Sequence, residues 1–145
     1  MINSGLMTWQ SWALLSAVFA ALTAIFAKVG VSDINSDMAT LIRTVIILCV
    51  LALIVLATGQ WEELSAISSR TWVFLTLSAL ATGASWVCYF RALKIGDAAR
   101  VAPIDKLSIV LVAVFGVFML GERLSAANWL GVGLCTAGIM LIAMR

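Results

Sequence analysis

The fold of this chain is decided by the stretch Thr44–Trp61, which reads TVIILCVLALIVLATGQW and carries no charged side chain. A helix of roughly 20 apolar residues crosses the ~30 Å hydrocarbon core of a bilayer. Further uncharged runs flank this stretch at Met1–Ala27, Thr71–Phe90, Leu107–Gly121 and Leu124–Met144. The sequence therefore predicts an all-α, polytopic membrane protein with five transmembrane helices. The fourth run is short unless the helix also takes in residues 104–106.

The expected helix boundaries follow from the residues between the apolar runs that typically end or begin a helix. We place the helices at residues 9–29, 38–58, 72–93, 102–120 and 128–144 of a single transmembrane domain, residues 1–145. Gly59, Gly96 and Gly121 mark points where a helix can end, and Asn128 is the expected N-cap of the last helix. Tryptophan favours the membrane–water interface, and five of the six tryptophans lie near these ends: Trp9, Trp12, Trp61, Trp72 and Trp129.

Composition excludes several classes of function. The chain is 63% hydrophobic and 11% charged, against about 25% charged in a soluble domain. Its net charge of +2 is too small and scattered to predict a nucleic-acid partner. There is no histidine, and Cys49, Cys88 and Cys135 all fall within predicted helices, where we interpret them as small apolar residues. We therefore expect no metal, no cofactor and no enzymatic activity.

The distribution of Lys and Arg predicts the orientation in the cell (inner) membrane, because cytoplasmic flanks carry the excess of positive charge. The side that includes the N-terminus holds only Arg70 and Arg123. The N-terminus is therefore expected outside and the C-terminus in the cytoplasm. The opposite, cytoplasmic side holds Lys28, Arg43, Arg91, Lys94, Arg100, Lys106 and Arg145.

The third predicted helix carries the clearest polar face. Ser78, Thr82, Ser85 and Tyr89 recur at helical spacing, and Trp86 lies beside them. Such a face offers hydroxyls and an aromatic wall to a small amphipathic solute, which predicts a substrate pathway. The alternative is a helix–helix seam, because Ser and Thr are common where membrane helices pack against each other.

A second candidate site is formed by charged residues near the cytoplasmic ends. Lys28, Arg43 and Lys106 would make an electropositive vestibule, with Asp105 as their partner or as a proton acceptor. At that side Asp105 is the only carboxylate expected inside a helix. The alternative is that Arg43 and Lys106 extend toward the headgroups and serve only orientation.

Several motifs resemble the EamA domain of the drug/metabolite transporter superfamily. The run Tyr89–Ser108, YFRALKIGDAARVAPIDKLS, resembles that domain's passage from the third helix to the fourth. Later segments resemble the end of its fourth helix and its Gly-rich fifth helix, and Arg43 matches a basic residue early in its second helix. These segments are LGERLS at 120–125, WLGVG at 129–133 and the Ala-Gly pair at 137–138.

The resemblance implies a fold and an activity. Proteins of this superfamily usually have two such domains in tandem, with inverted halves around a central cavity, and export or exchange small metabolites. This chain shows one domain, so the resemblance implies pairing with another five-helix chain as a homo- or hetero-oligomer. The charge bias disfavours a simple antiparallel homodimer. The first helix lacks the glutamate of the small multidrug resistance proteins, which argues against a cation-drug exporter of that type.

Two hypotheses of function remain. The first is a membrane transporter, or a half-transporter, that moves small metabolites by alternating access as an exporter or exchanger. The alternative is a non-transporting membrane subunit that stabilises a partner or binds lipid through its Gly and Ala seams.

Overall fold

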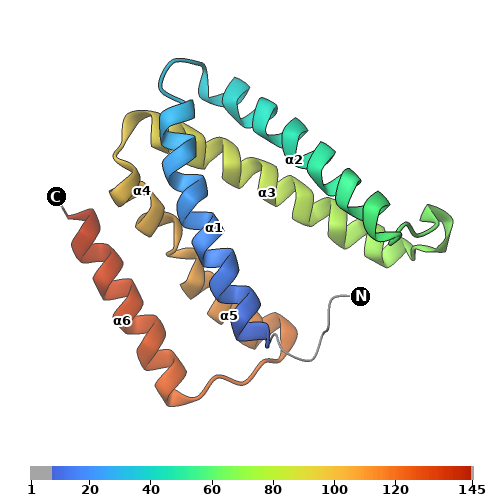
Figure 1. The fold of residues 1–145 in the computed structure, drawn as a ribbon. Coiled ribbons are helices and arrows are strands. Elements are labelled where there is room, and N and C mark those ends of the chain that lie inside the picture. Colours follow the sequence, from blue (N-terminus) through green and yellow to red (C-terminus); the bar gives the residue numbers. More distant parts are fainter. Residues whose placement is uncertain (1–7, 145) are drawn as a thin grey trace. The chain divides into compact units, whose positions relative to one another are not determined.

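The computed structural model describes residues 8–144, which form helices joined by short links (Figure 1). One compact unit contains α1 (Trp9–Gly30), α2 (Ser36–Thr58) and α3 (Ser69–Ile95), and a short 3-10 turn, η1 (Leu64–Ala66), lies in the link between α2 and α3. A second unit contains α4 (Ala98–Asp105), α5 (Ser108–Leu120) and α6 (Ala126–Ala143). Arg145, counted above among the cytoplasmic positive charges, lies outside the described residues.

The spans agree with the sequence-based prediction. Within residues 8–144, five helical segments are long and apolar enough to cross a membrane, and α4 and α5 together form the fourth. Large apolar side chains cover their surfaces; Leu53 is 65% exposed and Leu80 is 66% exposed. In a bilayer such side chains meet lipid, while the helical backbone satisfies its own hydrogen bonds. The predicted all-α, polytopic fold is confirmed.

Glycines end three of the helices, as predicted. The helices α2, α3 and α5 stop directly before Gly59, Gly96 and Gly121. Gly59 has φ 65° and Gly121 has φ 70°, the left-handed conformation that a side chain disfavours. In this conformation the amide of Gly59 donates to the carbonyl of Leu56, a group that the end of α2 leaves without a helical partner.

Two helix starts differ from the prediction. Asn128 is not the N-cap of α6; Ser125 is, and its Oγ accepts a hydrogen bond of 3.2 Å from the Asn128 amide. The helix α2 is capped by Asn35, whose Oδ1 accepts from the amide of Asp37 at 2.8 Å. This cap starts α2 at Ser36, two residues before the expected position, and places Asp37 in its first turn.

The fourth span is interrupted, whereas the sequence predicted one helix over residues 102–120. Pro103 lies inside α4 and has no amide hydrogen to donate. Tight turns follow it: the amide of Lys106 donates to the carbonyl of Pro103 at 2.9 Å, and that of Leu107 to the carbonyl of Ile104 at 3.0 Å. These i to i−3 bonds tighten the backbone and separate α4 from α5.

In the first unit, α2 and α3 lie side by side and α1 contacts α3 (Figure 1). The buried side chains gather where α1 ends, α2 begins and α3 ends; they are Ala24, Val31, Ala39, Thr40, Phe90 and Leu93. We call this region the junction of the first unit. It fixes the relative positions of three helix ends.

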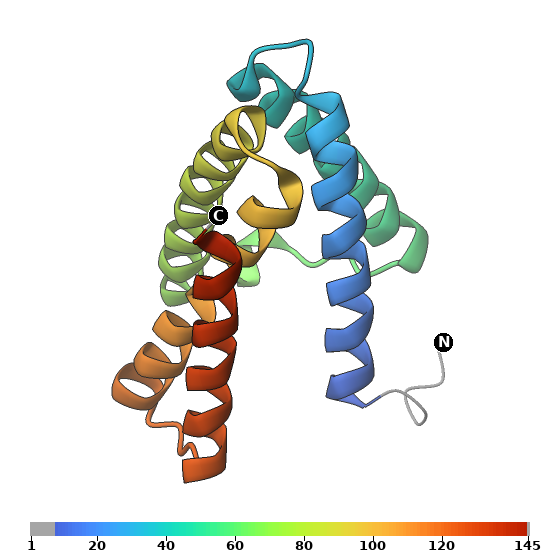
Figure 2. The same ribbon diagram turned by 90° about the vertical axis from the view of Figure 1, so that its left-hand side faces the viewer.

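In the second unit, α6 contacts both α4 and α5, and α5 lies beside α6 (Figure 2). Gly116 of α5 is buried. A methyl group added there would lie 2.6 Å from Oε2 of Glu122, so the glutamate side chain folds back over this glycine.

Candidate functional site

Lysines bind the backbone at the junction of the first unit. Lys28, in the last turn of α1, donates from Nζ to the carbonyl of Leu93 at 2.7 Å. That carbonyl belongs to the last turn of α3, where carbonyl groups lack helical partners. Lys94 similarly donates to the carbonyl of Ile34, in the link before α2. Lys28 therefore stabilises the end of α3, whereas Lys94 joins that end to the link before α2. Both lysines also place positive charge in the last turn of a helix.

An ion pair joins α2 to α3 at the same junction. Arg91 donates from Nε to Oδ1 of Asp37 at 2.9 Å and from Nη2 to Oδ2 at 2.7 Å. This two-point geometry adds both energy and geometric specificity to the ion pair. The prediction that Asp105 is the only carboxylate inside a helix at that side was wrong, because the Asn35 cap brings Asp37 into α2.

Sequence reasoning missed Asp37 and Arg91 as a linked pair. The available signal was their opposite charge at two helix ends that the predicted topology already placed on the same side of the membrane. Recognising the pair also required knowing which face of each helix meets the other, which the periodicity of one helix does not show.

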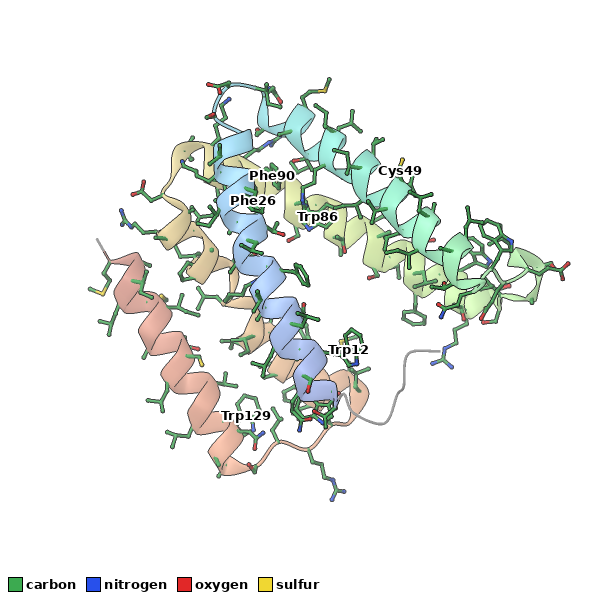
Figure 3. All side chains as sticks on the ribbon, in the orientation of Figure 1. Trp12, Phe26, Cys49, Trp86, Phe90 and Trp129 are labelled. Atoms are coloured by element: carbon green, nitrogen blue, oxygen red, sulfur yellow. The ribbon has the colours of Figure 1, made fainter. Side chains whose placement is uncertain are left out.

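A groove of about 540 Å³ lies against the junction, lined by α1, α2 and α3. Its wall is mainly apolar, and among the residues that the structure describes Arg43 is its one charged lining residue. The lining residues are Thr23, Phe26, Ala27, Gly30, Ile34, Ala39, Ile42, Arg43, Ile46, Ile47 and Phe90. Figure 3 shows Phe26 on α1 and Phe90 on α3 near this end of the unit.

The guanidinium of Arg43 lies over two aromatic rings. Its Cζ is 4.2 Å from the centre of the Trp86 ring and 5.5 Å from that of Phe90. Both rings come from α3, where they lie four positions apart in sequence, and Figure 3 labels both on that helix. A guanidinium in this position gains a cation–π attraction. Of the predicted vestibule and pathway residues, the structure therefore brings Arg43 and Trp86 together.

The hydroxyls of the predicted pathway lie elsewhere on α3. Ser78, Thr82 and Ser85 are exposed, and none of them lines the groove. The Thr82 hydroxyl donates to the carbonyl of Ser78 at 2.9 Å, within the helix. Tyr89 is half-buried, with its ring edge-on to Phe90 at 6.3 Å between ring centres. Whether the hydroxyl face binds a solute stays a prediction.

In the second unit, Asp105 ends α4 and Lys106 occupies the break before α5. Lys106 Nζ lies 3.1 Å from Oδ2 of Asp105, and both side chains are partly exposed. A shallow groove of about 650 Å³ lies beside them, with Lys106 as its one charged residue. It is lined by Lys106, Ser108, Ile109, Val112, Cys135, Gly138, Ile139 and Ile142.

One further contact in this unit links α4 to the end of α6. Arg100 Nη2 donates to the carbonyl of Ala143 at 3.3 Å. Arg100 thus supports the last turn of α6 in the way that Lys28 supports the last turn of α3, over a longer distance.

The five apolar spans define a multi-pass membrane protein. A family model described as the EamA-like transporter family matches residues 7–144, and the chain belongs to this family. The resemblance of this sequence to the EamA domain is therefore confirmed.

Two relatives extend the comparison. A protein described as an uncharacterized transporter in the cobO 3′ region, from Sinorhizobium sp., is 71% identical over 137 residues, which are 94% of this chain and 97% of that protein. A probable 4-amino-4-deoxy-L-arabinose-phosphoundecaprenol flippase subunit ArnE, from Hamiltonella defensa, is 27% identical over 86 residues, which are 59% of this chain and 76% of that protein. No solved structure matches the chain significantly.

Proposed function

We propose that residues 1–145 form one EamA-type domain, half of a transporter that pairs with a second five-helix chain and moves a small metabolite by alternating access. The observation that carries this proposal is the pair of relatives. The Sinorhizobium transporter is matched over 97% of its length by this chain, so that relative has room for only one such domain. The Hamiltonella relative is named a subunit. Inverted halves around a shared site are a general design of secondary transporters.

The proposed orientation has the N-terminus outside and the C-terminus in the cytoplasm. Within the first unit, Lys28, Arg43, Arg91 and Lys94 belong to the junction end, whereas Arg70 lies at the start of α3, its far end. This segregation of positive charge supports a cytoplasmic junction. A fluorescent protein fused to the C-terminus should fold and fluoresce, since it would stay in the cytoplasm. If this fusion is dark, and a second C-terminal fusion to a reporter that works only outside the cytoplasm is active, the orientation is the reverse.

The proposed route uses the two predicted sets of residues. The α3 face of Ser78, Thr82, Ser85, Trp86 and Tyr89 would line the membrane-embedded part. The cytoplasmic vestibule would be formed by Lys28, Arg43, Asp105 and Lys106. The contact between Arg43 and Trp86 supports this proposal, because it places a vestibule residue against a pathway residue.

The test of the proposed function is solute uptake by liposomes that contain only the purified chain, screened over amino acids, sugars and nucleobases. Chemical crosslinking of the same liposomes reports the oligomer. Saturable flux from a crosslinkable dimer is the expected result for a homo-oligomer. If flux appears only after a second five-helix chain is added, the transporter is a hetero-oligomer.

The second candidate function is a non-transporting membrane subunit that stabilises a partner or binds lipid, and the name of the Hamiltonella relative, a flippase subunit, is consistent with this function as well as with the first. In that case this chain would carry no solute, either alone or in the assembled complex. Removing the chain would then lower the amount of the partner in the membrane without changing the flux per partner molecule.

Energy coupling, if it uses protons, is proposed to involve Asp105. Asp105→Asn should abolish uphill transport while exchange of labelled for unlabelled solute continues, because exchange needs no net proton movement. Lys106→Gln is the matched control, since it breaks the same 3.1 Å ion pair but leaves the carboxylate in place. Unchanged uphill flux in Asp105→Asn would exclude this coupling role.

A further inference from the structure

Arg43 occupies an unusual position in the first unit. It lies two turns inside α2, which begins at Ser36, and it is half-buried. A charged side chain near the membrane interior costs free energy unless something compensates it. An acidic residue of the same helix, Asp37, is already bound at two points by Arg91. Among residues 8–144, no carboxylate forms an ion pair with Arg43.

The direction of the Arg43 side chain argues against a role limited to reaching the headgroups. Such a role would carry the guanidinium toward the junction end, where α3 terminates at Ile95. Instead the guanidinium lies nearer to Trp86 than to Phe90, at 4.2 Å against 5.5 Å. Trp86 is one helical turn further from the end of α3 than Phe90. The side chain is therefore held within the groove.

The donors of Arg43 are left with capacity to bind a ligand. The Trp86 ring lies 4.2 Å from Cζ of Arg43, and the N–H groups of a guanidinium point outward from the edge of its plane. Within the part of the chain that the structure describes, Arg43 donates no hydrogen bond. An anionic oxygen placed against that edge would receive charge-assisted hydrogen bonds in apolar surroundings, where such bonds are strong.

The remainder of the groove suits an apolar chain. Ile42 and Ile46 lie one turn apart on α2, with Ile47 next to them, and Phe26 faces the groove from α1. No acidic side chain lines the groove. We propose that this groove binds an anionic amphiphile, with its phosphate or carboxylate headgroup on the edge of Arg43 and its hydrocarbon chain along Ile42, Ile46 and Phe26.

This inference deepens the proposed function, on which it rests, by naming the substrate class of the Arg43 groove. The same chemistry has two sources: an anionic phospholipid of the bilayer, or an amphiphilic solute that enters the groove. The site requires an anionic oxygen and an alkyl chain from either source.

The test is ligand binding by the full chain, measured by native mass spectrometry from detergent micelles. The probe is dodecyl phosphate, and dodecylphosphocholine is the comparison ligand because it has the same chain but a zwitterionic headgroup. We expect dodecyl phosphate to bind saturably and Arg43→Gln to weaken that binding about tenfold or more, the size expected for a lost charge-assisted pair. Dodecylphosphocholine should bind weakly to both proteins.

Two variants control for folding and for loss of charge alone. Arg43→Lys keeps the charge but loses the planar edge, so it should bind with intermediate affinity. Arg70→Gln removes an arginine that also lies over a ring, Phe74, at 5.9 Å, but outside the groove. It should leave binding unchanged. Equal binding of dodecyl phosphate by wild type and a folded Arg43→Gln protein would overturn the proposal, as would an equal loss in Arg70→Gln.

A second arm separates the two sources. It measures dodecyl phosphate binding to the chain in nanodiscs with and without phosphatidylglycerol. If phosphatidylglycerol lowers this binding, the Arg43 site is assigned to a bilayer lipid. If the binding is unchanged, the site is assigned to a solute. The binding assay needs no flux: Arg43-dependent binding without transport contradicts the proposed function alone, whereas transport with Arg43-independent binding contradicts this inference alone.

Discussion

In the unit of α1, α2 and α3, several charged side chains link the helices at one end, whereas in the unit of α4, α5 and α6 one described charged side chain does so. The first unit has the Asp37–Arg91 pair and the bond from Lys28 to the Leu93 carbonyl. In the second, the described polar link between helices is the longer bond from Arg100 to the Ala143 carbonyl. Asp105 and Lys106 pair with each other as neighbours in sequence.

The grooves of the two units differ in the same way. In the first unit the charged lining residue, Arg43, lies over two rings within the groove. In the second unit the charged lining residue, Lys106, is paired with its neighbour Asp105 and largely exposed. The comparison indicates that the first unit combines a fixed scaffold with an available cation, whereas the second provides an apolar surface.

The largest expected effect is from Trp86→Ala. It removes the surface on which Arg43 rests and should lower the free energy of unfolding by about 2 kcal/mol, combining lost burial with a lost cation–π contact. Binding in the groove should weaken as well. Unfolding in mixed detergent and SDS micelles measures the stability.

The matched control for Trp86→Ala is Trp129→Ala in the second unit. Trp129 is 40% exposed and has no cation over its ring among the described residues. Its loss should cost less than that of Trp86. Equal losses of stability would contradict the view that the contact between Arg43 and Trp86 stabilises the first unit.

The next effect is from Lys28→Met. It removes a 2.7 Å bond to the carbonyl of Leu93, whose side chain is fully buried, and should cost about 1–2 kcal/mol. Arg100→Met removes the corresponding 3.3 Å bond in the second unit and should cost less, because a longer hydrogen bond is weaker. A larger loss of stability in Arg100→Met than in Lys28→Met would contradict the stronger stabilisation of the first unit by its charged side chains.

A smaller effect is expected for the Asp37–Arg91 pair, because both side chains are about half exposed. The informative quantity is the coupling in a double-mutant cycle of Asp37→Asn and Arg91→Gln, measured as thermal stability in detergent. We expect favourable coupling, because this pair joins two helices. The same cycle for Asp105→Asn and Lys106→Gln should give weaker coupling, since that pair fixes no second helix.

The smallest effect on stability is expected from Thr82→Val, because the Thr82 hydroxyl donates its hydrogen bond to the carbonyl of Ser78 within the same helix. Thr136→Val is the matched change in the second unit, where the hydroxyl donates to the carbonyl of Val132 at 2.7 Å. Both should be nearly neutral for stability. A change in transport with Thr82→Val at unchanged stability would identify the hydroxyl face of α3 as part of the substrate route.

Much of the site was not predictable from one sequence. The sequence drew attention to Arg43 and Trp86 separately, one as a cytoplasmic charge and the other as a pathway residue, and the structure places them 4.2 Å apart. The capping role of Asn35 was not foreseen, so Asp37 was left outside the second helix. Choosing between caps depends on a local backbone geometry that several Asn and Ser residues in this chain could adopt.

The sequence by itself determined the five spans, their order, the helix ends at Gly59, Gly96 and Gly121, and membership of the transporter family. These properties are local: hydrophobic length and glycine at helix ends act within one segment, and the solvent of each helix is lipid. The tertiary structure decided that the fourth span breaks after Pro103, that Asp37 binds Arg91, and that Arg43 lies over Trp86. Such contacts depend on how each helix is rotated and how far it extends beside its neighbour, and uniformly apolar helices leave that rotation undetermined in the sequence.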